Sequence, residues 1–250
     1  MKLLRVAEVE SAALSPWAAA AYQEIRDKVL DDAFPCTFGT VAQRRGEILY
    51  AFIGPDDLRN ALIAYTDLLR PLEPVVASLT PLAVVMPPRE GFNERDYFEY
   101  GWTLLQQLHE KDTHAWPDRI PKDPDDPKWS YCFGGLPLFV NFKTPTHVRR
   151  KSRRTERSFM LLFQSRDGFD VVAGDSVQGR RARDLIRRKL AAYDDVGVYP
   201  ELSHYATAEN REWRQYFVPE ANAPLARECP FHVTAQPTVT SQPTGPSSTK

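Results

Sequence analysis

The stretch PLFVNFKTPTHVRRKSRRTERSFMLLFQ, residues 137–164, predicts two β-strands joined by a cationic segment. Its ends, 137–143 and 158–164, are rich in branched and aromatic residues, which favour strands. Five of the six residues at 149–154 are cationic, although the whole chain has 32 Lys and Arg against 33 Asp and Glu. The proline of TPTH ends the first strand, so we expect His147 to lie at a strand exit.

Helices and further strands alternate with these two strands along the chain. Ser15 followed by Pro16 is a typical helix start. Asn93 can cap a helix that runs to about Lys111, and the apolar run LAVVM at 82–86 predicts a strand buried on both faces. The sequence also predicts a strand at 47–53, a helix carrying Leu58, Leu62, Tyr65 and Leu69 on one side, a basic helix with Leu185, Ile186 and Leu190 on its inner side, and a short helix within 210–217.

These elements predict one α/β domain of the mixed α+β kind at 1–232, with a central β-sheet flanked by helices. The remaining sequence, VTAQPTVTSQPTGPSSTK at 233–250, is rich in Pro, Ser and Thr and has no hydrophobic periodicity. We expect it to be a disordered tail, because it has little apolar surface to bury against the entropic cost of ordering.

Composition is that of an ordinary globular protein, with 42% hydrophobic and 26% charged residues in 250. No apolar run approaches the ~20 residues needed to cross a bilayer, and Glu8 and Glu10 interrupt the N-terminal apolar stretch, which is not typical of a secretory signal. The three cysteines, Cys36, Cys132 and Cys229, are far apart and form no CxxC pair. We therefore expect a cytoplasmic protein with no membrane partner.

The cationic segment has three interpretations. Lys and Arg clusters neutralise phosphates, so segments 149–157 and 180–189 are compatible with a nucleic-acid-binding module, although the net charge of −1 and the lack of a binding motif argue against a nucleic-acid partner. A solvated loop beside the Asp-rich segment 121–128 accounts for the composition as well. In the third interpretation, His147 ligates a metal or haem iron, and the arginines after it clamp carboxylates.

Two other places in the sequence carry candidate ligands. His109 follows Phe98, Trp102 and Leu105 at helical spacing, which would make an apolar wall for a planar cofactor or an ordinary core face. Cys36 in FPCTFG is either a thiolate ligand or a small buried residue. The sequence contains no GxGxxG, P-loop, GxSxG or HExxH motif, so dinucleotide, nucleoside-triphosphate, serine-hydrolase and zincin functions lack support.

Several segments, taken in order, resemble the YqcI/YcgG family from about residue 30 to 231. They are FPCTFG at 34–39, YAFIG at 50–54, LLQQLHEKD at 104–112, W-x-YCFGGLPLFV at 129–140, TPTHVRRKSRR at 144–154, LLFQSR at 161–166, EWRQYF and the later CPF. The FGG-x-P and TP-x-H-x-x-R-x-SR segments are the most specific. The resemblance implies a haem-dependent N-hydroxylase that contains haem b and acts on the guanidine of arginine, or of a modified arginine, in natural-product biosynthesis.

The same resemblance assigns residues to the cofactor. The TP-x-H position is His147, which we predict to be the axial ligand of the haem iron. The R-x-SR positions are Arg150, Ser152 and Arg153, which we predict to anchor the propionates. The extra basic residues of VRRKSRR leave open which arginines face the cofactor.

The LH-x-x-D segment supplies His109 with Asp112 as its acid, and we predict that this pair is catalytic. His109 is also a second candidate for the iron ligand, and Cys36 is the thiolate alternative. Trp102 and Phe38 are predicted to be among the aromatic residues that bury the apolar disk of the haem.

The main hypothesis is a cytoplasmic haem enzyme that hydroxylates a nitrogen of an amino-acid-derived amine or guanidine. Oxygen with electrons from a redox partner, or peroxide, would supply the oxygen atom. Two alternatives stay open at this point: a haem-binding sensor or carrier without turnover, and a nucleic-acid-binding module that uses the two basic segments.

Overall fold

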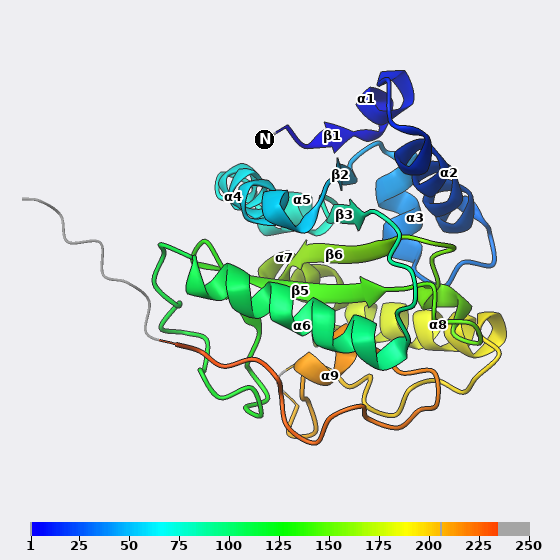
Figure 1. Ribbon diagram of the computed structural model, residues 1–250. Helices are drawn as coiled ribbons and strands as arrows, with labels where there is room; N and C mark the ends of the chain where they lie inside the picture. The colour runs from blue at the N-terminus through cyan, green and yellow to red at the C-terminus, as the bar shows by residue number, and fades with distance from the viewer. Residues whose placement is uncertain (1, 206, 235–250) are drawn as a thin grey trace, which may run out of the picture.

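A computed structural model describes residues 2–205 and 207–234, and its strands form one mixed sheet (Figure 1). The strands are β1 (Leu4–Arg5), β2 (Leu49–Phe52), β3 (Leu82–Met86), β4 (Tyr131–Phe133), β5 (Leu136–Lys143) and β6 (Phe159–Ser165). Their order across the sheet is β1-β2-β3-β6-β5-β4. β2 and β3 run parallel, and the other neighbours are antiparallel.

Helices cover both faces of this sheet. They are α1 (Val6–Ser11), α2 (Pro16–Leu30), α3 (Thr37–Arg44), α4 (Leu58–Leu69), α5 (Pro74–Ser78), α6 (Glu94–Glu110), α7 (Arg166–Ala173), α8 (Val177–Tyr193) and α9 (Trp213–Tyr216), with 3₁₀ turns at Pro55–Asp57 and Lys151–Arg153. Figure 1 shows α6 in front of β5 and β6, with α7 and α8 behind these strands. The predicted mixed α+β class, a central sheet flanked by helices, is confirmed.

Local sequence signals explain where the two predicted long helices begin. Pro16 is the first residue of α2, and Ser15 precedes it in an extended conformation. The Asn93 side chain accepts hydrogen bonds from the backbone N–H groups of Arg95 and Asp96, at 2.8 and 3.1 Å, at the start of α6. The Asp96 carboxylate in turn accepts a hydrogen bond from the Asn93 N–H at 2.8 Å, which completes a capping box.

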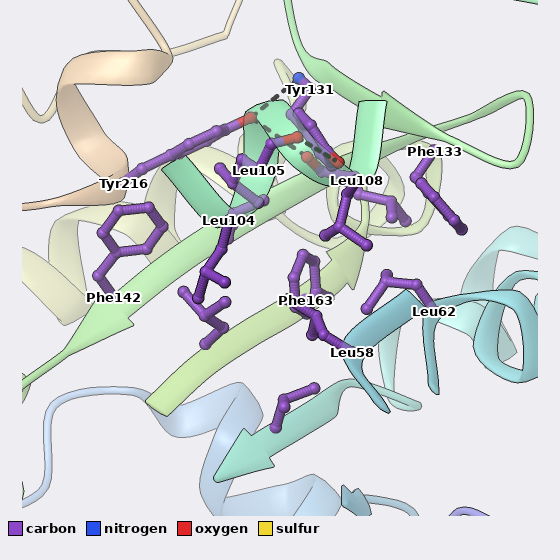
Figure 2. Close-up of a cluster of buried hydrophobic side chains, with 14 of the residues drawn as sticks. Leu58, Leu62, Leu104, Leu105, Leu108, Tyr131, Phe133, Phe142, Phe163 and Tyr216 are labelled. Carbon is purple, nitrogen blue, oxygen red and sulfur yellow. Dashed lines mark hydrogen bonds between the residues drawn. The ribbon is translucent and has the colours of Figure 1, made fainter. Parts of the chain in front are cut away.

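Alternation along β5 separates two environments. Leu138, Val140 and Phe142 are buried in a large apolar cluster with residues of α4 and α6. We call this side of the sheet the core face, and Figure 2 shows part of its cluster. The residues between them, such as Phe139 and Asn141, point to the opposite side, which we call the second face.

The second face is covered in two halves. Over β2 and β3, residues of α2 and α3 form a smaller apolar cluster that includes Tyr22, Ala42 and Val85. Over β5 and β6 the covering elements are α7 and α8 (Figure 1). Leu185 of α8, predicted to point inward, is instead 41% exposed, because the inner side of this helix is turned toward Ile186 and Leu190.

The C-terminal segment lies along α6 as far as the structure describes it. Gln106 exchanges hydrogen bonds with the backbone of His232, at 3.0 and 3.2 Å. Of the predicted tail at 233–250, residues 235–250 lie outside the described residues. Among the helices that are described, none combines the length and the apolar character needed to span a membrane.

Candidate functional site

A pocket opens on the second face of the sheet, between β5 and β6 on one side and α8 on the other. It contains about 1010 Å³ of empty space, including the part open to solvent. Its walls combine aromatic and aliphatic side chains with cationic ones. The lining residues are Phe34, Pro35, Cys36, Phe38, Phe139, Asn141, Lys143, Ser152, Arg153, Gln164, Arg166, Phe169, Arg183, Ile186, Arg187, Leu190, Leu202, Ser203 and Gln215.

The floor of the pocket comes from alternate residues of β5. Phe139, Asn141 and Lys143 line the pocket, and Gln164 of β6 pairs opposite Phe139 in the sheet. The Asn141 Oδ1 atom is buried and has no hydrogen-bond partner in the described residues. An unpaired buried acceptor is costly, so a ligand N–H group would satisfy Asn141 here.

The roof comes from one side of α8. Arg183, Ile186, Arg187 and Leu190 line the pocket, and their spacing of three and four residues places them on one helix face. Phe169 of α7 closes the same side. Its ring stacks on the Phe139 ring with centroids 5.7 Å apart and planes at 7°. Apolar groups of α7, α8 and β5 therefore form part of the pocket wall.

Cys36 brings a sulfur atom to the pocket. It precedes α3 as its N-cap residue, and its Sγ accepts a hydrogen bond from the Gly39 N–H at 3.4 Å. The residue is partly exposed and lines the pocket beside Phe38. A negatively charged sulfur is favoured at the N-terminus of a helix. Among the ligand candidates from the sequence, Cys36 is the one that the structure brings to the pocket.

Two cations at this end of the pocket have no carboxylate partner among the described residues. Lys143 Nζ donates to the Ser152 carbonyl at 2.7 Å, and Arg153 donates to the carbonyls of Tyr216 and Gln215 at 3.3 and 3.4 Å. Burial, together with the charge of Arg153, lowers the pKa of Lys143 to about 7. Burial also lowers the pKa of Arg153 to about 10. An anionic ligand would offset the cost of these desolvated charges.

Arg166 is a third cation of the pocket and is neutralised within the protein. It donates to Glu212 at 3.0 Å and also to Asp170. Its guanidinium lies over the rings of Phe169 and Tyr205, 4.9 and 4.4 Å from their centroids. Burial raises the pKa of Glu212, and the charge of Arg166 opposes that rise. No Asp or Glu is among the described residues that line the pocket.

His147 lies away from the pocket, in contact with the Phe217 ring at 5.0 Å between centroids. Its Nε2 donates to the Val218 carbonyl at 3.0 Å, so Nδ1 is the acceptor for the Thr144 hydroxyl at 3.1 Å. Burial, with help from nearby cations, lowers the pKa of His147 to about 3. The imidazole is thus neutral, and both of its nitrogens have protein partners.

His109, Asp112 and Trp102 lie on the core face, so the sheet separates them from the pocket. His109 Nε2 accepts from the Thr234 N–H at 3.0 Å, and its Nδ1 has no partner among the described residues. Asp112 accepts from the Gly134 N–H at 2.7 Å, which holds the turn between β4 and β5. The structure gives Asp112 a positioning role in that turn, and its predicted catalytic role stays a prediction.

The predicted propionate anchors separate into two groups. Ser152 and Arg153 line the pocket, and Ser152 also donates twice to the Asp194 carboxylate, at 2.7 and 2.8 Å. Arg150 is buried outside the pocket, where its guanidinium donates to Asn222 Oδ1 at 2.5 Å.

The remaining cations of segment 149–154 also have partners in the protein. Arg149 donates to the Asp195 carbonyl, Lys151 pairs with the Asp195 carboxylate, and Arg154 pairs with Glu156. The segment therefore joins distant parts of the chain, and Lys151 and Arg154 are paired with carboxylates of the protein.

Sequence reasoning missed most of the pocket, although one signal was present. Phe139, Asn141 and Lys143 alternate with the apolar residues of the same strand, which indicates a face that is not ordinary core. Arg166, Arg183 and Arg187 carried no such signal. Among the described residues, no group of three or more His, Cys, Asp or Glu side chains could hold a metal ion.

Comparisons with known proteins show which family the chain resembles over most of its length. Residues 25–232 match the YqcI/YcgG family. The chain is 35% identical over 226 residues to "Putative N(omega)-hydroxy-L-arginine synthase DcsA" of Streptomyces lavendulae, covering 87% of this chain and 85% of that protein. Two proteins of Bacillus subtilis (strain 168), "Uncharacterized protein YcgG" and "Uncharacterized protein YqcI", are 33% and 35% identical, each over 87% of this chain and 89% of the relative. No solved structure matches significantly.

Proposed function

Because the chain belongs to the YqcI/YcgG family, we propose that it is an enzyme that hydroxylates a nitrogen of arginine or of a related amino-acid-derived amine or guanidine. The name of the Streptomyces lavendulae relative supports this reaction and this substrate class. A role in natural-product biosynthesis stays a prediction of the sequence resemblance.

We propose haem b as the cofactor, and the composition of the pocket on the second face supports this choice. Haem is an apolar disk with two carboxylates. The rings of Phe34, Phe38 and Phe139 supply apolar walls, and Lys143 and Arg153 supply positive charges that lack a carboxylate partner among the described residues. This combination of apolar walls and uncompensated cations is the observation that carries the proposal.

Cys36 is the best candidate for the iron ligand in this pocket. Its sulfur has a single weak N–H contact, so coordination would cost little in lost hydrogen bonds. His147, the ligand expected from the resemblance, would have to give up its bond to Val218 or to Thr144 first. His109 lies on the other side of the sheet. We therefore favour thiolate ligation over ligation by either histidine.

Bound haem supplies the activation of oxygen or peroxide that inserts one oxygen atom into an N–H bond. With oxygen, two electrons from a redox partner and two protons convert the second oxygen atom to water. With peroxide, the second oxygen atom leaves as water without added electrons. The protein contributes charge compensation through Lys143 and Arg153, apolar walls through Phe139 and Phe169, and an acceptor for a substrate N–H in Asn141 Oδ1.

Product analysis tests this proposal. Purified protein loaded with haem is incubated with arginine and either peroxide, or oxygen and a reducing system. We expect a product heavier than arginine by one oxygen atom, located on a guanidine nitrogen by fragmentation. Haem-loaded protein that binds arginine and consumes none of it under either condition would instead be a sensor or carrier.

A further inference from the structure

Arg183 and Arg187 form a pair of like charges on the pocket side of α8. They are four residues apart, and both line the pocket. Like charges at this spacing destabilise a helix. Arg187 is the second cause, after burial, of the lowered pKa of Arg183. The helix therefore holds two mutually repelling cations against the same cavity.

Neither arginine has a carboxylate partner among the described residues. Arg183 Nη1 donates to the carbonyls of Ala173 and of Gly174, the latter at 2.7 Å. Arg187 Nη2 donates to the Leu202 carbonyl at 2.8 Å. These bonds hold the two guanidinium groups in position without pairing either group with a carboxylate. An anion between them would relieve their repulsion and accept paired N–H bonds.

Of this pair, Arg183 lies farther from the segment that carries Cys36. Lys189, near the C-terminal end of α8, donates to the Phe34 carbonyl at 2.8 Å, so that part of the helix lies beside the segment that carries Cys36. Arg183 contacts the C-terminal end of α7 instead. Six residues separate Arg183 from Lys189, or about 9 Å along a helix axis. Arg183 thus lies well along α8 from the part of the helix that is beside Cys36, and Arg187 lies between them in the sequence of the helix.

We propose that Arg183 and Arg187 bind the carboxylate of the substrate and make the pocket specific for an amino acid over the corresponding amine. This inference rests on the proposed function for its choice of substrate. An extended arginine held by its carboxylate at this pair would direct its guanidine along the pocket toward Asn141 and Cys36. Because no Asp or Glu is among the described lining residues, selectivity comes from the acidic end of the substrate.

The test compares arginine with agmatine, which has the same guanidine and no carboxylate. Binding is measured by calorimetry on haem-loaded wild type, Arg183→Gln and Arg187→Gln, with KM and kcat where turnover is observed. The matched control is Arg181→Gln/Arg188→Gln, which removes two exposed charges from the outer side of the same helix. Haem absorption and thermal melting are recorded for every variant, and Arg187→Lys tests whether charge alone suffices.

We expect wild type to bind arginine much more tightly than agmatine. Each Gln variant should lose roughly ten- to a hundredfold in arginine affinity, the range for a hydrogen bond to a charged group, and should change little toward agmatine. Haem absorption and the control variant should match wild type, and Arg187→Lys should retain part of the affinity.

Three results would overturn the inference. They are equal binding of arginine and agmatine by wild type, unchanged arginine affinity in both Gln variants, and loss of haem with arginine affinity retained, which would assign the pair to the haem carboxylates. Failure of the proposed function is a separate result, namely that wild type takes up no haem. In that case calorimetry on the haem-free protein still tests the carboxylate subsite. Binding of arginine that is selective over agmatine and depends on Arg183 supports the subsite, whereas no binding of arginine rejects it.

Discussion

The two faces of strand β5 share one backbone but differ in what their side chains contact. Leu138, Val140 and Phe142 are fully buried on the core face, whereas Asn141 and Lys143 line a pocket on the second face. On the core face these three side chains pack against other apolar groups. On the second face an amide oxygen and an ammonium group lack ideal partners. The comparison shows that this strand serves stability through one side and ligand binding through the other.

The largest expected effect is on stability, and it is measured by replacing one phenylalanine on each face with alanine. Phe142 is fully buried against Trp102, so Phe142→Ala should lower the free energy of unfolding by about 3–5 kcal/mol. Phe139 is only partly buried, so Phe139→Ala should cost less stability and should lower kcat/KM by opening the pocket to water. Urea unfolding measures the first effect. Equal losses of stability would remove the distinction between the faces.

Acidification should destabilise the protein through the buried residue His147. His147 has a pKa of about 3 in the folded protein and about 6.5 when unfolded. Between these values the unfolded chain binds one more proton, so the free energy of unfolding falls as pH is lowered from about 6.5 toward 3, by up to several kcal/mol at ~1.4 kcal/mol per pKa unit.

His147→Gln should remove the contribution of this histidine to the pH dependence of the free energy of unfolding. We expect the stability of apoprotein to fall less steeply with acid in the variant than in wild type, whatever the absolute cost of the substitution. Denaturant unfolding at several pH values measures the difference in slope. Parallel curves would mean that His147 is not buried in its neutral form.

A smaller effect on stability, compared with the effect on kcat, should show whether Asp112 has a structural or a catalytic role. Its carboxylate accepts from the Gly134 and His114 N–H groups at 2.7 and 3.0 Å. Asp112→Asn should therefore cost about 1.5–3 kcal/mol of stability. If Asp112 acts only through the turn, kcat should be unchanged at a temperature where the variant is folded. A large loss of kcat without loss of stability would support the catalytic prediction made from the sequence.

The smallest expected effect is an increase in stability rather than a loss. Asn141 Oδ1 is buried without a partner, so Asn141→Leu should stabilise the apoprotein by about 1 kcal/mol. The same change removes an acceptor for the substrate N–H and should raise KM or lower kcat. Thermal melting and kinetics on one preparation measure both. A destabilised variant with normal kinetics would show that Asn141 serves the fold rather than the ligand.

Local patterns were sufficient to predict much of the architecture. LAVVM gave β3 with its exact bounds, Leu82–Met86, because five consecutive apolar residues suit a strand buried on both faces. Asn93 predicted the start of α6 through its capping side chain, and the Ser15-Pro16 pair predicted the start of α2 because proline suits the first position of a helix. α3 was missed, since its sequence TFGTVAQR is short and contains a glycine and β-branched residues that do not favour a helix.

The candidate site was harder to predict, because it depends on which elements meet on each face. His147 lies at a strand exit, as expected, but its Nε2 bonds to Val218, 71 residues later, and no local pattern reports that contact. Cys36 and Phe38 were identified as candidates and do line the pocket. Arg183 and Arg187 were assigned only to a basic helix, since the side of α8 that faces the sheet is set by tertiary packing.

The absorption spectrum of purified protein, produced with haem supplied, tests the central claim most directly. Spectra of the oxidised form and of the reduced form with carbon monoxide are compared for wild type, Cys36→Ala and His147→Ala, each confirmed as folded. The account predicts a haem band typical of thiolate ligation in wild type, its loss or displacement in Cys36→Ala, and its retention in His147→Ala. A wild type without a haem band, or a band that survives Cys36→Ala and disappears in His147→Ala, would contradict it.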